Sequence, residues 1–174
     1  MSVLRFFMLL SMVVWVGGII FFSFVVAPAL FNILPTRHLS GLVVTRVLAS
    51  LHWLGVICGG VFLICSFFEA YHSSGSVQAT AARNVLVAGM MVAALISQTV
   101  VSTKMAALRG KMGEIDKIAV SDPRRMAFNQ LHQWSTGLEV VVLILGLATL
   151  YIIARQWSIP ILNAVHTRSL STRA

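Results

Sequence analysis

Two histidines inside long apolar stretches are the side chains best suited to chemistry. His52 stands in the segment Leu51–Gly55, and His132 stands in Leu131–Ser135. An imidazole at membrane depth is costly, and it usually faces a bundle interior or a water-filled cavity. We therefore expect one site that contains both rings.

Small residues accompany both histidines. Gly55 and Gly59 lie three and seven residues after His52, which places them on the same helix face. They make room either for a flat ligand or for a neighbouring helix, because Gly-xxx-Gly is also a common packing device in membranes. Ser135 has the same role beside His132.

Two neutral imidazoles on facing helices can ligate haem iron from both sides. We predict that haem b binds between the second and fourth helices, with His52 and His132 as the metal ligands. In the alternative interpretation, each histidine donates to a backbone carbonyl or to Gln98 across the bundle. A copper site is a further hypothesis, using Cys58 and methionine thioethers, although methionine is also ordinary apolar filler.

Glu139 is a carboxyl group two turns deeper than His132 on the same helix face. At that depth it must be protonated, be paired with a cation, or take part in a proton path. We expect Glu139, Gln98 and Arg46 to surround the histidines as supporting partners.

The composition excludes a soluble domain. Of the 174 residues, 58% are hydrophobic and 10% are charged, and the mean hydropathy is +0.90. Each helical crossing needs roughly 20 apolar residues, and the sequence supplies four such runs. We predict an all-α, four-helix transmembrane bundle with helices near residues 3–26, 42–68, 83–104 and 123–154. Residues 1–156 form this single domain, and residues 157–174 form a polar C-terminal tail.

Proline and capping residues predict where the helices begin and end. Pro28 should close the first helix, and that apolar run is too long for a signal peptide, so we expect it to be retained. Asp122 and Pro123 read as a cap followed by proline at the first helical position. The loop between residues 105 and 125 should carry a short surface helix around Lys111, Glu114 and Lys117.

The net charge of +8 indicates membrane orientation and lipid contact, with no nucleic-acid partner. We define side A as the end with the N-terminus and side B as the end with loops 32–40 and 105–125. Eight Lys and Arg residues belong to side B and five to side A. The positive-inside rule then predicts that side B is cytoplasmic and that both termini are outside, in a bacterial inner membrane. The side B cations are Arg37, Arg46, Lys104, Arg109, Lys111, Lys117, Arg124 and Arg125.

An ordered series of motifs runs along the chain: Leu4–Phe6, Trp15–Gly18, Phe21–Phe22, Ala27–Phe31, Leu51–Gly55, Lys104–Arg109 and Phe128-x-x-Leu131-His132. This series resembles the domain family that includes transmembrane protein 205. This resemblance implies a four-helix membrane bundle without established chemistry. A weaker likeness, through Trp15-x-Gly17-Gly18, is to CopD and to HemJ-type oxidases. Those families carry a functional histidine two turns before the tryptophan, where this chain has Met8.

The leading hypothesis is therefore a membrane bundle that binds a small ligand, haem b first, with a redox or haem-handling role. One rival is a non-catalytic subunit that packs against a larger membrane complex or against copies of itself. Another is a HemJ-like oxidase or a copper carrier. No soluble-enzyme motif is present in the sequence, and the assignment as an enzyme stays open.

Overall fold

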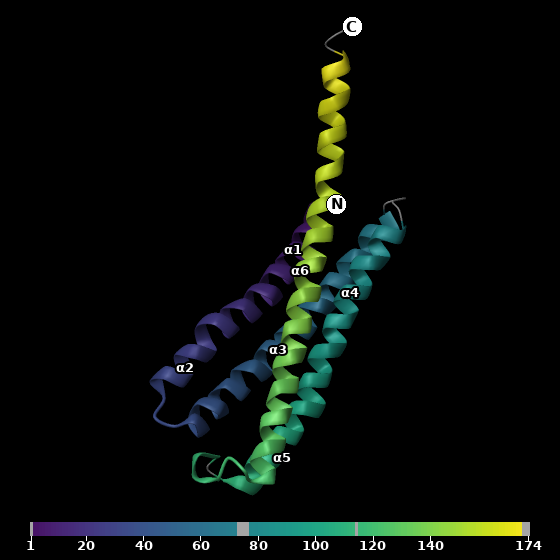
Figure 1. Cartoon of the computed structure of the whole chain (residues 1–174). Coiled ribbons are helices and arrows are strands. Elements are labelled where there is room, and N and C mark those ends of the chain that lie inside the picture. The colour runs from purple at the N-terminus through teal and green to yellow at the C-terminus, as the bar shows by residue number, and fades with distance from the viewer. Residues whose placement is uncertain (1, 73–76, 114, 172–174) are drawn as a thin grey trace.

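Four apolar helices run side by side through the structure, a computed structural model that describes residues 2–72, 77–113 and 115–171 (Figure 1). No strand occurs in those ranges. The segments long and apolar enough to cross a membrane are Val3–Ile33, Arg37–His72, Ala82–Met112 and Pro123–Gln156. The prediction of an all-α, four-helix transmembrane bundle is confirmed.

Two of these segments contain a π-helical turn. The first segment consists of α1 (Ser2–Phe21), η1 (Phe22–Val26) and α2 (Ala27–Ile33), and the second is α3 (Arg37–His72). The third consists of α4 (Val77–Ile96), η2 (Ser97–Val101) and α5 (Ser102–Met112). A 3-10 turn, η3 (Ile115–Lys117), precedes the last helix, α6 (Pro123–Ser171). In η1 and η2 the hydrogen bonds span five residues, from Ala27 N–H to the Phe22 carbonyl and from Ser102 N–H to the Ser97 carbonyl.

The helices pack in an antiparallel order. α1 contacts α3 and α6, while α4 contacts α3 and α6 from the other side. The turn between α2 and α3 and the loop that precedes α6 lie together at side B (Figure 1). The N-terminus lies at side A, where α6 continues past the ends of the other helices.

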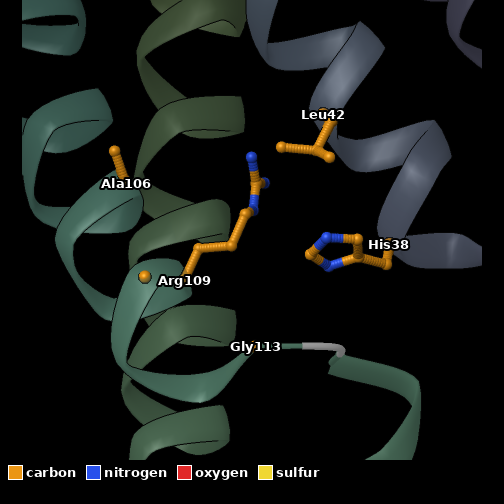
Figure 2. Close-up of a pocket in the computed structure, with 6 residues that line it drawn as sticks. His38, Leu42, Ala106, Arg109 and Gly113 are labelled. Carbon is orange, nitrogen blue, oxygen red and sulfur yellow. The ribbon is translucent and has the colours of Figure 1, made fainter.

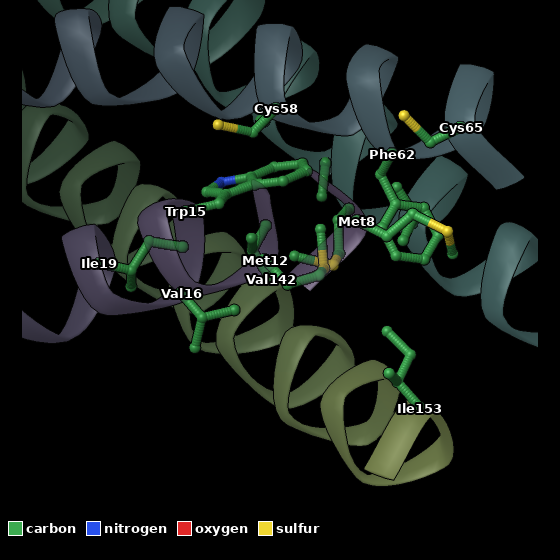
Figure 3. Packing of buried hydrophobic residues seen from close by; sticks show 14 residues of the cluster. Met8, Met12, Trp15, Val16, Ile19, Cys58, Phe62, Cys65, Val142 and Ile153 are labelled. Carbon is green, nitrogen blue, oxygen red and sulfur yellow. The ribbon is translucent and has the colours of Figure 1, made fainter. Parts of the chain in front are cut away.

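A core of apolar side chains fills the side A half of the bundle (Figure 3). Trp15 is 1% exposed and lies against α3. A Cβ atom at Gly55 would lie 2.3 Å from Trp15 Nε1, and one at Gly59 would lie 3.0 Å from the same indole. The space beside His52 is thus occupied by Trp15. In this structure the two glycines serve close helix packing, which is the alternative to a ligand slot.

Pro28 does not end the first segment, contrary to our expectation. It lies at the start of α2, directly after the π turn. Proline lacks an N–H, and the five-residue spacing of η1 shifts the carbonyl that its ring would otherwise meet. The helix ends at Leu34, which has an extended backbone (φ −79, ψ 141) because Pro35 follows it.

The other helices are longer than the sequence suggested. α3 begins at Arg37 rather than near Leu42, and α5 continues to Met112, where only a 3-10 turn follows in place of the expected surface helix. Glu114 lies outside the described residues. α6 begins at Pro123 as predicted and remains helical to Ser171, beyond the end that we expected near residue 154.

Candidate functional site

The centre of the site is a three-helix hydrogen-bond network around His52. His52, on α3, is 4% exposed. Its Nδ1 lies 3.1 Å from Gln98 Oε1 on η2, so this nitrogen donates to the amide oxygen. Its Nε2 contacts Glu139 Oε1 on α6. The alternative in which the ring bonds to Gln98 therefore describes His52 correctly.

The contact between His52 and Glu139 holds one proton in either of two arrangements. With the proton on Nε2, an imidazolium donates to a carboxylate; with the proton on Oε1, a carboxylic acid donates to a neutral ring. Both arrangements carry zero net charge, which is the requirement for burial at this depth. The proton can therefore move between Nε2 and Oε1 without changing the net charge of the pair.

The network lies near the middle of the membrane spans. His52 is residue 16 of the 36 in α3, and Glu139 is residue 17 of the 34 in the span Pro123–Gln156. The network lies well inside the side B end of the bundle, because α3 and α5 extend further on that side than predicted.

An inner pocket of about 220 Å³ opens from this network towards side B. Glu139 contributes to its wall, and its polar lining also includes Ser135, Thr136 and His132 from the same helix. The remaining lining comes from the other three segments: Phe22, Ser23, Ala27, Phe31, Val44, Thr45, Leu48, Ser102 and Met105. Every membrane-spanning segment thus contributes to the pocket.

His132 occupies a different position from the one we expected. It is exposed and lies at the wall of the inner pocket, two turns along α6 from Glu139. His52 is directed to Gln98 and Glu139 instead, and it is not among the lining residues of that pocket. The structure therefore brings Gln98, Glu139 and His52 together and leaves the two imidazoles apart.

Arg46 is exposed on α3, and the inner pocket is lined without it. The cation that approaches the polar end is Arg109 of α5, whose guanidinium is 3.4 Å from Thr45 Oγ1. No group of three or more His, Cys, Asp or Glu side chains converges among the described residues. Cys58 and Cys65 are both buried and free.

Sequence reasoning missed the π turns. η2 carries Gln98, and η1 supplies Phe22 and Ser23 to the pocket. A π turn inserts one residue into the helical register and so re-aims the side chains that follow; such turns are frequent at functional sites. No residue pattern in either segment signals this irregularity.

A second polar cluster at side A was also missed. Glu69 of α3 is 6% exposed and accepts hydrogen bonds from Arg83 of α4 at 2.6 Å and from Arg5 of α1 at 2.7 Å. Arg83 also donates to Ser66 at 3.1 Å and to Gln156 at 3.2 Å. A lone acid in the apolar sequence Phe67-Phe68-Glu69 was the available signal. We had counted Arg5 and Arg83 only as orientation charges.

Comparison with known proteins gives a family. The model of a domain of unknown function, DUF4149, matches residues 10–114, more than half of the chain. The chain belongs to the DUF4149 family. The matched part of the DUF4149 domain includes His52 and Gln98 and ends before α6, which supplies Glu139. No curated protein and no solved structure matches the chain.

Proposed function

We propose that this DUF4149 protein binds a small ligand in the inner pocket, against the proton held between His52 and Glu139. The observation that carries the proposal is the double role of Glu139, which lines the pocket and also contacts His52. A titratable group inside a membrane bundle is costly, and its exposure to a cavity is typical of functional sites.

The lining of the pocket suits a mostly apolar ligand with one polar end. Apolar side chains from the first three segments form much of the wall, whereas all four residues that α6 contributes are polar. This division is typical of ligand pockets, in which a few polar groups fix orientation. The volume of about 220 Å³ is below the roughly 300–1,000 Å³ of drug-sized ligands. We therefore expect a small molecule, or one part of a larger one.

An occlusion experiment tests this proposal. Ser135 is 6% exposed and lines the pocket, so Ser135→Leu should fill part of the volume. Ser50→Leu is the matched control, because Ser50 is exposed on α3 and outside the pocket lining. Native mass spectrometry of the full chain should detect a co-purifying small molecule in the wild type and the control, with at least about tenfold lower occupancy in Ser135→Leu.

Equal occupancy in the two serine variants, or a wild type without any bound molecule, would overturn the proposal. Glu139→Gln provides a second variant with almost unchanged side-chain volume. This variant should bind the co-purifying molecule more weakly. Its midpoint of thermal unfolding shows whether the substitution also disturbs folding.

Haem b remains the specific ligand that the sequence predicts. Iron ligation by His52 would require one ring nitrogen to leave Gln98 or Glu139. A purified sample with a Soret band that disappears in His52→Ala and His132→Ala, but persists in His72→Ala, would support haem. His72 is a suitable control because it is exposed at the far end of α3. A colourless sample would exclude haem, but it would not contradict the proposal that the inner pocket binds another small molecule.

The finer likenesses to transmembrane protein 205, CopD and HemJ, and a location in a bacterial inner membrane, are likewise proposals. The accessory-subunit hypothesis is tested by co-purification, since a fixed ratio of another membrane chain would support it.

A further inference from the structure

A second cavity, the outer vestibule, lies at side B and has a volume of about 240 Å³. Its lining contains three arginines and two histidines, and none of its 13 lining residues is acidic. The basic members are Arg37, His38, Arg109, Arg125 and His132. They come from the start of α3, the end of α5 and the start of α6, so the fold gathers basic side chains that lie far apart in the sequence.

Two of the vestibule arginines, Arg109 and Arg125, contact neutral groups. The Arg109 guanidinium donates to the Gly41 carbonyl and to Thr45 Oγ1, each at 3.4 Å, and lies 5.3 Å from the Phe128 ring centroid. Arg125 donates to the Ile118 carbonyl. Neither arginine has a carboxylate partner in the described part of the chain. These contacts with neutral oxygens leave each guanidinium with further N–H donors.

A polar atom without a partner also belongs to this cavity. His38 Nδ1 is buried and makes no hydrogen bond in the structure, and His38 lines the vestibule. Figure 2 shows Arg109 reaching from α5 towards His38 and Leu42 on α3. The nearby Asp116 is engaged with the backbone N–H of His38 at 3.1 Å. A buried ring nitrogen without a partner, beside guanidinium groups without carboxylate partners, is a suitable environment for an anion.

The vestibule adjoins the inner pocket. Five residues line both cavities: Phe31, Val44, Thr45, Met105 and His132. One molecule can therefore occupy both, with a charged end among the arginines and an apolar end near Glu139. The arginines lie at the membrane end of the bundle, the depth at which lipid head groups are found.

We propose that the vestibule binds the phosphate of an anionic amphiphile whose hydrocarbon chain enters the inner pocket. This inference rests on the proposed function, and it names the class of its ligand. The planar guanidinium fork matches two phosphate oxygens at once, which favours phosphate over a point-charge partner. A lipid phosphate in the bilayer supplies both the anion and the chain.

The test compares three probes on the full chain in detergent: dioleoyl phosphatidic acid, dioleoyl phosphatidylcholine and inorganic phosphate. The wild type should bind phosphatidic acid at least about tenfold more tightly than the other two, because only this probe combines net negative charge with a chain. The double variant R109Q/R125Q should lose about tenfold of that preference. Lys104→Gln, which removes an exposed cation of α5 outside the vestibule lining, should retain it.

Arg37→Gln provides a variant with little risk to folding, because Arg37 is exposed at the start of α3. It should reduce the preference for phosphatidic acid a few-fold. Equal affinity for the two lipids, or an unchanged preference in the double variant, would overturn the proposal. Inorganic phosphate that binds as tightly as phosphatidic acid would also overturn it, since the chain would then contribute nothing.

Failure of this inference is distinguishable from failure of the proposed function. If both lipids bind equally and Ser135→Leu abolishes their binding, the inner pocket holds a chain and only the phosphate site is wrong. If neither lipid binds and Ser135→Leu changes no occupancy, the inner pocket itself is not a ligand site.

Discussion

At the scale of single residues, the partners of His52 decide what the site can do. Gln98 occupies Nδ1 as an acceptor, which requires a proton on that nitrogen. Nε2 is then the nitrogen that shares the mobile proton with Glu139. Glu139 accordingly connects the buried ring to the cavity, and its carboxyl group is the one that a ligand can reach.

Trp15 depends on the absence of a side chain at Gly55. Gly55→Ala would place a Cβ atom 2.3 Å from Trp15 Nε1, so either the indole or the helix must move. Overpacking of this kind typically costs about 1–3 kcal/mol, and we expect a lower midpoint of thermal unfolding in detergent. Gly60→Ala is the control, because nothing lies within 4 Å of its Cβ position. Equal midpoints for the two variants would show that Trp15 is not held tightly.

Glu69 forms ion pairs with two arginines at side A, and its loss should destabilise the bundle strongly. Glu69→Gln leaves Arg83, which is 3% exposed, without a carboxylate partner. Removing one member of a buried ion pair costs about 3–5 kcal/mol. Arg5→Gln should cost less, because the Arg5 side chain is 43% exposed. Unfolding measured in a mixed detergent series checks this order, and the reverse order would contradict the assignment.

At the scale of elements, the two π turns and the helix starts determine how the side chains are presented. α6 begins where Asp122 Oδ1 accepts the Arg124 N–H at 2.8 Å and Pro123 takes the first helical position. Asp122 also pairs with the Arg124 side chain at 2.9 Å. The cap fixes the register at which α6 delivers His132 and Glu139 to the pocket.

The cap has a defined pH dependence. Hydrogen bonds and charge from Arg124 lower the pKa of Asp122 from 3.8 to about 2. A lowered folded-state pKa stabilises the protein above the unfolded-state value, and this contribution is lost as the pH falls through the folded-state value. The difference in unfolding midpoint between the wild type and Asp122→Ala should thus be full above about pH 4 and shrink towards pH 2. Asp122→Asn should retain the cap without the titration; a difference that persists unchanged at pH 2 would contradict this account.

At the scale of the whole molecule, the bundle places two cavities in its side B half and a packed core in its side A half. The distribution of Lys and Arg predicts that side B is cytoplasmic. In a bacterial host, alkaline phosphatase fused after Arg155 should be active, whereas the same enzyme inserted after Val120 should be inactive. Val120 is exposed in the side B loop. The opposite pattern would reverse the membrane orientation.

The sequence by itself determined the class and the chemistry of the residues. Hydrophobic runs of sufficient length can only form membrane helices, because a backbone in hydrocarbon must satisfy its own hydrogen bonds. The cost of placing a titratable side chain inside a membrane identified His52, His132 and Glu139 as candidate site residues. Pro123 fixed the start of α6 because local capping chemistry needs no tertiary partner.

Only the tertiary structure decided which of these residues meet. The pairing of His52 with Glu139, the filling of the glycine space by Trp15 and the triad of Arg5, Glu69 and Arg83 each join different helices. Helical periodicity gives the face of a residue, but rotation and height relative to neighbouring helices come from packing. The π turns could not be predicted from the sequence for the same reason. A π turn inserts an extra residue into the helix, and this insertion becomes favourable only when the surrounding helices accommodate it.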